Sequence, residues 1–191
     1  MQHDIHSERD AGADSEDRGR KLRRISRVAE WLALAGMVGV LAYSGYLWSN
    51  QAALSAFLLR EVPGVAVAAA GGSMILAGML SLIPVAIFVA AMWEVRRLFR
   101  LLGKSRVLDP AVPRLLVRLG RLAVAAAVAG IVVRTLVVLV MTSSNPPGQK
   151  HLVIGIGSNE FASLIIGLLL FAFALVVQES LRIVDENRSF V

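Results

Sequence analysis

The sequence contains no cysteine, and this absence excludes disulfide bonds, thiolate zinc sites, iron–sulfur clusters and cysteine nucleophiles. Charge is also scarce: Asp, Glu, Lys and Arg make up 18% of the chain, where about a quarter is usual in a soluble domain. Hydrophobic residues reach 56%. The few charges are crowded into short stretches that separate long apolar runs. This distribution indicates an integral membrane protein.

Groups that could carry out catalysis are few and poorly placed. No apolar run has an Asp or Glu near its middle, so a proton relay or cation site built from carboxylates has no ligands. The histidines, His3, His6 and His151, lie in polar segments at a spacing that does not suit a metal site. The "GKS" at 103–105 lacks the glycine pattern and the preceding strand of a phosphate-binding loop. We therefore expect no enzyme activity, no metal and no cofactor.

Four apolar runs are close to the ~20 residues that a helix needs to cross ~30 Å of hydrocarbon. They predict transmembrane helices at about residues 31–49, 73–93, 122–142 and 161–178. Trp31, Trp48 and Trp93 lie at the ends of the first two runs, as is typical of the membrane interface. Pro84 is expected to kink the second helix. The predicted fold class is an all-α integral membrane protein, with the four helices arranged as two helical hairpins.

The segments between the runs have their own patterns. Residues 49–64 predict a loop with a short interfacial helix, and the glycine pair at 71–72 predicts a break before the second span. The "HLVIGIG" at 151–157 is consistent with a short strand or an interfacial patch. Residues 94–121 predict a basic elbow, in which Gly103 ends one helix and Asp109–Pro110 begin the next.

Lys and Arg are distributed very unevenly among the loops. Of the 20 Lys and Arg, 17 lie before the first span, in the elbow at 94–121 or after the fourth span. The exceptions are Arg60, Arg134 and Lys150. The positive-inside rule therefore predicts that both termini and the elbow are cytoplasmic, in a multi-pass protein of the bacterial cytoplasmic (inner) membrane. Because the basic residues run directly into membrane helices, we expect them to meet anionic lipid headgroups of the cytoplasmic leaflet and expect no nucleic acid.

The chain divides into two predicted parts. Residues 1–25 are polar without an apolar period and predict a disordered, charged cytoplasmic tail. Residues 26–191 predict the four-helix transmembrane domain, which ends in a cytoplasmic helix at 179–191. In the elbow, the basic side chains predicted to contact lipid or a protein partner are Arg96, Arg97, Arg100, Lys104, Arg106, Arg114 and Arg118.

Arg134 is the only ionisable residue inside a predicted span. Thirteen residues separate it from Arg121, a rise of ~20 Å, so it lies about two-thirds of the way across the membrane. It shares one helix face with small residues, which would let another helix approach closely: Gly120, Ala123, Ala127 and Gly130. Glu160 is the first candidate partner and Glu61 the second. An ion pair that pins two helices is favoured over an anion contact in an outward-facing cavity.

Two segments resemble a known family. "RRLFRLLGKSRVLDPAVPRLLVRLGRL" at 96–122 is followed by two spans and "QESLRIVDENRSFV" at 178–191. This arrangement resembles the bacterial four-helix membrane family DUF2975 over roughly residues 30–191. The matching positions are Leu98, Phe99, Arg100, Gly103, Leu115, Arg118 and Gly120, then Ser180–Arg182, Asp185–Asn187 and Phe190–Val191. The family has no established activity, so the resemblance implies no catalytic residue. Its association with small DNA-binding regulators implies a membrane-bound regulatory role.

Two functional hypotheses follow. The first is a non-enzymatic regulatory or sensory membrane protein that acts through its basic elbow and C-terminal helix on a cytoplasmic or membrane protein partner. The alternative is a subunit of an oligomeric transporter or channel, with Arg134 lining the path of an anion or small solute. A homo-oligomer is compatible with both.

Overall fold

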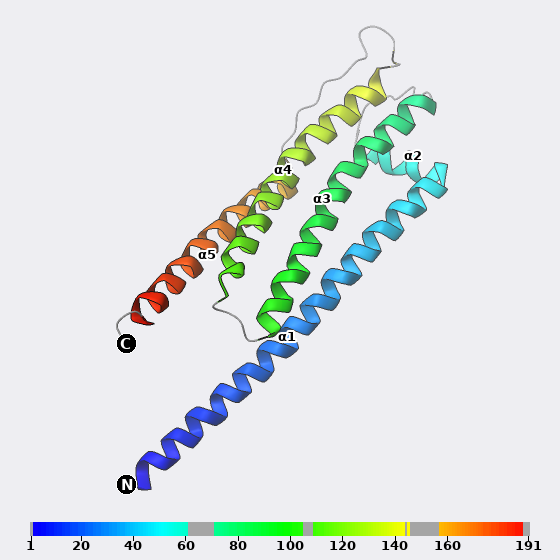
Figure 1. Cartoon of the computed structure of the whole chain (residues 1–191). Coiled ribbons are helices and arrows are strands. Elements are labelled where there is room, and N and C mark those ends of the chain that lie inside the picture. The colour runs from blue at the N-terminus through cyan, green and yellow to red at the C-terminus, as the bar shows by residue number, and fades with distance from the viewer. Residues whose placement is uncertain (1, 61–70, 105–108, 144, 146–156, 189–191) are drawn as a thin grey trace.

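The computed structural model describes residues 2–60, 71–104, 109–143, 145 and 157–188, and within these ranges the side chains of residues 20 and 23–186. The described chain forms five helices and no strand (Figure 1): α1 (Gln2–Ser49), α2 (Gln51–Arg60), α3 (Gly71–Gly103), α4 (Ala111–Thr142) and α5 (Ser158–Arg188). Four of them, α1 over residues 23–49, α3, α4 and α5, are long and apolar enough to cross a membrane. Each contains one of the four predicted spans, so the all-helical prediction is confirmed.

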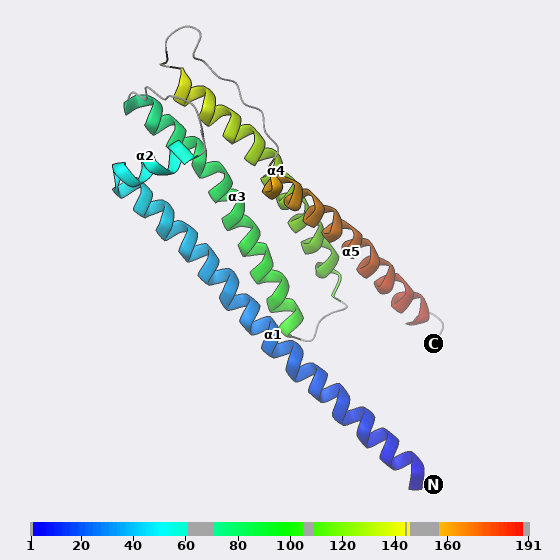
Figure 2. The ribbon, with the colours of Figure 1, turned by 180° about the vertical axis from the view of Figure 1, so that it is seen from behind.

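The long helices pack in the order α1, α3, α4, α5, each against the next. Figures 1 and 2 show neighbouring long helices running in opposite directions, with the start of α1 and the end of α5 at the same end of the molecule. We call this end the terminal end and the opposite one, where α2 and the start of α3 lie, the far end. Large apolar side chains are exposed along all four long helices, as expected of helices that face lipid.

The N-terminal tail differs from its prediction. Instead of being disordered over residues 1–25, the chain is helical from Gln2 onward and continues into the first span, so that α1 extends past the ends of the other helices (Figure 2). Extending an existing helix avoids the cost of nucleating one. Glu16 with Arg20 and Asp17 with Lys21 also have the i, i+4 spacing that favours a helix. The polar composition of residues 1–25 does not reveal that this segment continues the helix of the first span.

The short helix predicted within 49–64 is confirmed as α2, and one of its faces packs into the bundle. Asn50 begins it, because its Oδ1 accepts the backbone N–H groups of Ala52 and Ala53 at 3.1 and 3.2 Å. Leu54 and Leu58 are 8% and 0% exposed. They belong to one apolar cluster with residues of α1, α3 and α4: Leu47, Ala77, Val133, Val137, Val138 and Met141. The helix therefore fills the far end of the bundle.

α5 is displaced along α4 toward the terminal end. A Cβ built on Gly130 of α4 would lie 3.1 Å from Oε1 of Glu160, in the first turn of α5. Gly120 meets Gly167 further along, where a Cβ on Gly120 would lie 3.1 Å from the Gly167 carbonyl oxygen. α5 therefore begins beside the middle of α4, as both views show (Figures 1 and 2). The far part of α4 shares an apolar cluster with residues of α1, α2 and α3.

The predicted elbow is made of two helix ends and a turn. Gly103 ends α3, and a Cβ there would lie 3.2 Å from Cβ of Ser26 on α1. The backbone N–H of Ala111 donates to Oδ1 of Asp109 at 2.8 Å, so α4 begins one residue after the predicted start. α3 continues through Pro84. Arg106, Glu61 and all of "HLVIGIG" except Gly157 lie outside the described residues.

Candidate functional site

Five basic side chains surround one cavity at the terminal end. Arg97 and Arg100 come from the last turns of α3, Lys104 directly follows that helix, and Arg114 and Arg118 come from the first turns of α4. They line a cavity of about 360 Å³ together with apolar atoms of Leu101, Ala111 and Leu115. No acidic residue of the described chain lines it. We call this cavity the basic cleft.

Helix periodicity and a small apolar core bring these cations together. Arg97 and Arg100 are three residues apart on α3, and Arg114 and Arg118 are four apart on α4, so each pair occupies one helix face. Lys104 follows directly after the end of α3. Behind them the two helix ends share a buried cluster, consisting of Leu98, Val112, Leu115 and Leu119. Burial of the leucine faces fixes the approach of α3 to α4, and the basic faces meet as a consequence.

Glu94 holds two of these cations from outside the cleft. Its Oε1 lies 3.5 Å from Nη1 of Arg97 and 3.6 Å from Nη1 of Arg118, so it links α3 to α4. The Glu94 side chain is 14% exposed, whereas the two arginines are 53% and 59% exposed. Its second oxygen is buried without a hydrogen-bond partner. The carboxylate orients the two guanidinium groups and leaves Arg100, Lys104 and Arg114 without a carboxylate within ion-pair distance among the described residues.

The other predicted elbow contacts are divided. Arg96 does not line the basic cleft, and its Nε is buried without a hydrogen-bond partner. Arg121, which was not among the predicted contacts, lines a neighbouring cavity of about 680 Å³ with Trp93, Glu94 and Arg118. Of the seven predicted residues, the structure therefore brings five together and separates one, while Arg106 lies outside the described part.

A second polar cavity, of about 430 Å³, lies at the far end. It contains Arg134 and Glu160, the two residues predicted to pair, and also Arg60 from the last turn of α2. The remaining lining residues are Phe57, Ser81, Gly130, Val133, Val137, Gly157, Ser158 and Asn159. We call it the far-end cavity. It lies where the first turn of α5, which begins beside Gly130, meets α4 one turn before Arg134.

Two glycines seat the Glu160 carboxylate. A Cβ on Gly130 would lie 3.1 Å from Oε1 of Glu160, and a Cβ on Gly157 would lie 2.5 Å from Oε2. The Cβ position on Gly157 would also lie 3.7 Å from Nη1 of Arg134. Carboxylate and guanidinium therefore approach each other across Gly157. Among the described side chains, however, the ion pairs involve Glu94, Glu179 and Glu186 and do not join Glu160 to Arg134.

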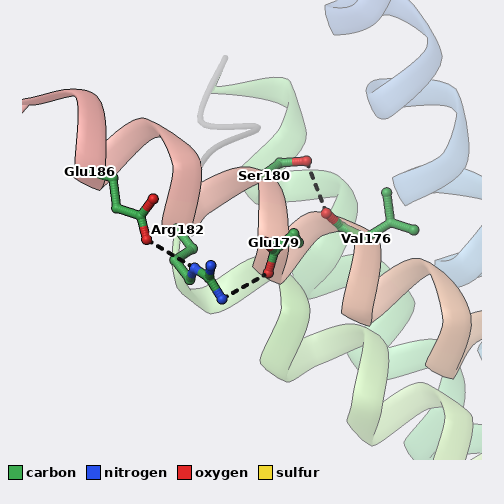
Figure 3. A network of polar contacts seen from close by, with 5 residues as sticks. All are labelled: Val176, Glu179, Ser180, Arg182 and Glu186. Carbon is green, nitrogen blue, oxygen red and sulfur yellow. Dashed lines mark hydrogen bonds and ion pairs between the residues drawn. The ribbon is translucent and has the colours of Figure 1, made fainter.

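The C-terminal helix predicted at 179–191 is the continuation of α5, described as far as Arg188. Arg182 contacts two carboxylates on its own helix (Figure 3): Nη1 lies 3.6 Å from Oε2 of Glu179, and Nε donates to Oε1 of Glu186 at 3.0 Å. The Ser180 hydroxyl donates to the carbonyl of Val176 at 2.9 Å. These contacts stabilise the helix beyond the apolar run and leave the groups exposed.

No group of three or more His, Asp or Glu that could hold a metal ion occurs in the part of the chain that the structure describes.

The residue that sequence reasoning missed is Arg60, which it placed in a loop between the first two spans without a role. The signal available in the sequence was that Arg60 is the only basic residue between the first two predicted spans. The structure adds that Leu58, two positions before it, is fully buried. That Arg60 and Arg134 line the same cavity is known only from the tertiary structure.

Comparison with known proteins gives one match. The family model described as "Protein of unknown function (DUF2975)" matches residues 29–189, which is nearly the whole chain and includes both cavities. No curated protein and no solved structure matches the chain.

Proposed function

The chain belongs to the DUF2975 family of proteins of unknown function. We propose that it is a non-enzymatic regulatory or sensory protein of the bacterial cytoplasmic membrane. In this proposal, the basic cleft binds the phosphate of an anionic lipid. The observation that carries the proposal is the basic cleft itself, in which four arginines of α3 and α4 and Lys104 of the turn after α3 line one cavity. Phosphate oxygens are favoured partners of guanidinium groups, which bind them in a bidentate manner.

The orientation rests on charge and shape together. The start of α1 and the end of α5 lie at the end of the molecule where α3 ends and α4 begins (Figure 1). The basic cleft lies between these ends of α3 and α4, and nearly all of the basic residues belong to the segments at this end. The positive-inside rule assigns such an end to the cytoplasm. The basic cleft then lies at the level of the inner headgroups, where the surface potential of anionic lipids attracts cations.

The surface of α1 fits the same placement. Arg24 and Arg27 line a cavity with the apolar residues Val28, Trp31 and Leu32. Trp31 is 66% exposed, as expected of an aromatic side chain at the membrane interface. A lipid bound with its phosphate at this level can place its acyl chains against apolar helix surface.

The regulatory part of the proposal concerns the elbow and the C-terminal helix. Both are at the end assigned to the cytoplasm, and Arg182 is held on the exposed face of α5 by its own carboxylates (Figure 3). We infer that a cytoplasmic partner contacts these two elements, and that lipid binding in the basic cleft sets the spacing of α3 and α4 beneath it.

Titration of the full-length protein in neutral detergent with short-chain phosphatidylglycerol tests the lipid site, with phosphatidylcholine of the same chain length as the reference lipid. Wild type is expected to bind phosphatidylglycerol more tightly, and Arg100→Gln is expected to weaken that binding by about tenfold, because a charged hydrogen bond contributes about 1.5–3 kcal/mol. The matched control is Arg182→Gln, which removes an equally charged, exposed residue outside the cleft. Equal binding of both lipids, or equal loss in both variants, contradicts the proposal.

A transporter or channel subunit is the second candidate. It is favoured by one observation, which is that cationic side chains of α4 line cavities near both of its ends. Anion flux into liposomes that is lost in Arg134→Ala and retained in Arg134→Lys would support it. Flux that is absent for every anion, or unaffected by Arg134→Ala, would contradict it.

A further inference from the structure

The far-end cavity collects three charged side chains from three different helices. Arg60 ends α2, Arg134 lies within the span of α4, and Glu160 lies in the first turn of α5. Each position is fixed by packing. Leu58, two residues before Arg60, is 0% exposed, Val133 beside Arg134 is 6% exposed, and Glu160 is seated against two glycines.

Among the described residues, the two guanidinium groups share this cavity with a single carboxylate, that of Glu160, and neither forms an ion pair with it. No ion pair or hydrogen bond of Arg60 or Arg134 occurs with a described side chain or backbone group. An arginine inside a span normally pairs with protein groups or marks a ligand pathway, because an uncompensated charge there is costly. With two guanidinium groups and one carboxylate, the described lining keeps a net positive charge that a bound anion would neutralise.

The remaining lining residues complete a binding site of ordinary character. Its volume of about 430 Å³ is within the roughly 300–1,000 Å³ usual for small-molecule sites. Phe57, Val133 and Val137 give it an apolar wall. The Ser81 hydroxyl donates to the carbonyl of Ala77 at 3.0 Å, so its oxygen still accepts a hydrogen bond from the cavity side.

We propose that the far-end cavity binds a small dicarboxylate, with one carboxylate on Arg60 and the other on Arg134. The described charged groups of the lining are two guanidinium groups and one carboxylate. An acidic α-amino acid complements all three, because its ammonium group can pair with Glu160 while its two carboxylates meet the arginines. A dicarboxylate without an amine can pair with both arginines, but it offers no ammonium group to the Glu160 carboxylate.

This site is separate from the basic cleft, which lies at the opposite end of the molecule, and it does not depend on what that cleft binds. It makes the protein a receptor for a solute at its far end, whatever the terminal end contacts. The two sites share only the rigid helices α3 and α4.

Calorimetric titration of the purified full-length protein in detergent tests the site, with L-glutamate, succinate and glycine as separate probes. We expect saturable binding of L-glutamate and succinate, and binding of glycine at least about tenfold weaker because it has one carboxylate. Arg60→Gln and Arg134→Gln are each expected to weaken L-glutamate binding by about tenfold or more. Arg182→Gln and Arg100→Gln, outside the cavity, are expected to leave it unchanged.

Glu160→Gln separates the two ligand types. Loss of the carboxylate is expected to weaken binding of L-glutamate and to strengthen that of succinate, because it removes an ammonium partner from one ligand and a repulsive charge from the other. Arg134→Lys keeps the positive charge in the span and serves if Arg134→Gln does not fold. The proposal is overturned if neither L-glutamate nor succinate binds saturably, or if Arg60→Gln and the Arg134 variants bind both as wild type does.

Discussion

Gly120 on α4 and Gly167 on α5 face each other where the two helices pack closely. A Cβ on Gly120 would lie 3.0 Å from Cε1 of Phe171 and 3.1 Å from the Gly167 carbonyl oxygen, and a Cβ on Gly167 would lie 3.1 Å from the Gly120 carbonyl oxygen. The backbones can meet only because both side chains are absent. The small-residue face predicted to receive another helix therefore does so at this level.

Gly120→Ala is expected to lower the free energy of unfolding by about 1–3 kcal/mol, because the added methyl group meets a backbone oxygen that cannot move without shifting a helix. Unfolding in mixed dodecyl sulfate and neutral detergent, followed by circular dichroism, measures the change. Gly39→Ala is the matched control, since a Cβ on this glycine of α1 meets nothing within 4 Å. An equal effect of the two substitutions would show that the α4–α5 approach is not tight.

Arg134 shows how far one residue can be predicted. Helical periodicity placed it on the small-residue face, and Gly130, one turn before it, does meet α5. What happens at Arg134 itself depends on where α5 begins, which the sequence of α4 does not contain. The structure adds Arg60, a residue from a different helix, and places both arginines in one cavity with Glu160.

α2 is the element whose role changes most between sequence and structure. Its apolar residues and its Asn50 cap are visible in the sequence, and a short helix was predicted there. A ten-residue helix could equally lie flat on a membrane, however. Only the structure shows that Leu54 and Leu58 are buried in one apolar cluster with residues of α1, α3 and α4.

Leu58→Ala is expected to lower the free energy of unfolding by about 2–4 kcal/mol, since the side chain is fully buried and the site has little room to collapse. Leu59→Ala removes the same atoms from a position that is 47% exposed and is expected to cost less than about 1 kcal/mol. Both are measured by the same detergent titration. If Leu59→Ala proves the more costly change, α2 lies with its other face toward the bundle.

The whole molecule can be oriented by experiment because it lacks cysteine, so that a single introduced thiol is the only one present. Ser180→Cys lies on exposed α5 at the terminal end, and Ser143→Cys lies exposed just after α4 at the far end. With the proposed orientation, a membrane-impermeant maleimide should label Ser143→Cys in intact cells. It should label Ser180→Cys only after permeabilisation. The unsubstituted protein provides the blank, and the reverse pattern would place both termini outside.

The sequence by itself determined the helical class, the four spans, the short helix before the second span and the gathering of basic residues at one end. These follow from local rules, because apolar length, helix periodicity and the placement of Lys and Arg each act within one segment. The cytoplasmic location of that end is still a prediction from the same rules.

The tertiary structure alone decided the offset of α5 along α4, the burial of α2 and the two polar cavities. The physical reason is that helix register depends on contacts between segments far apart in the chain, such as Gly120 with Gly167 and Gly130 with Glu160. The same register leaves Arg134 beyond the start of α5 and opposite Arg60. Neither helix carries that information in its own sequence.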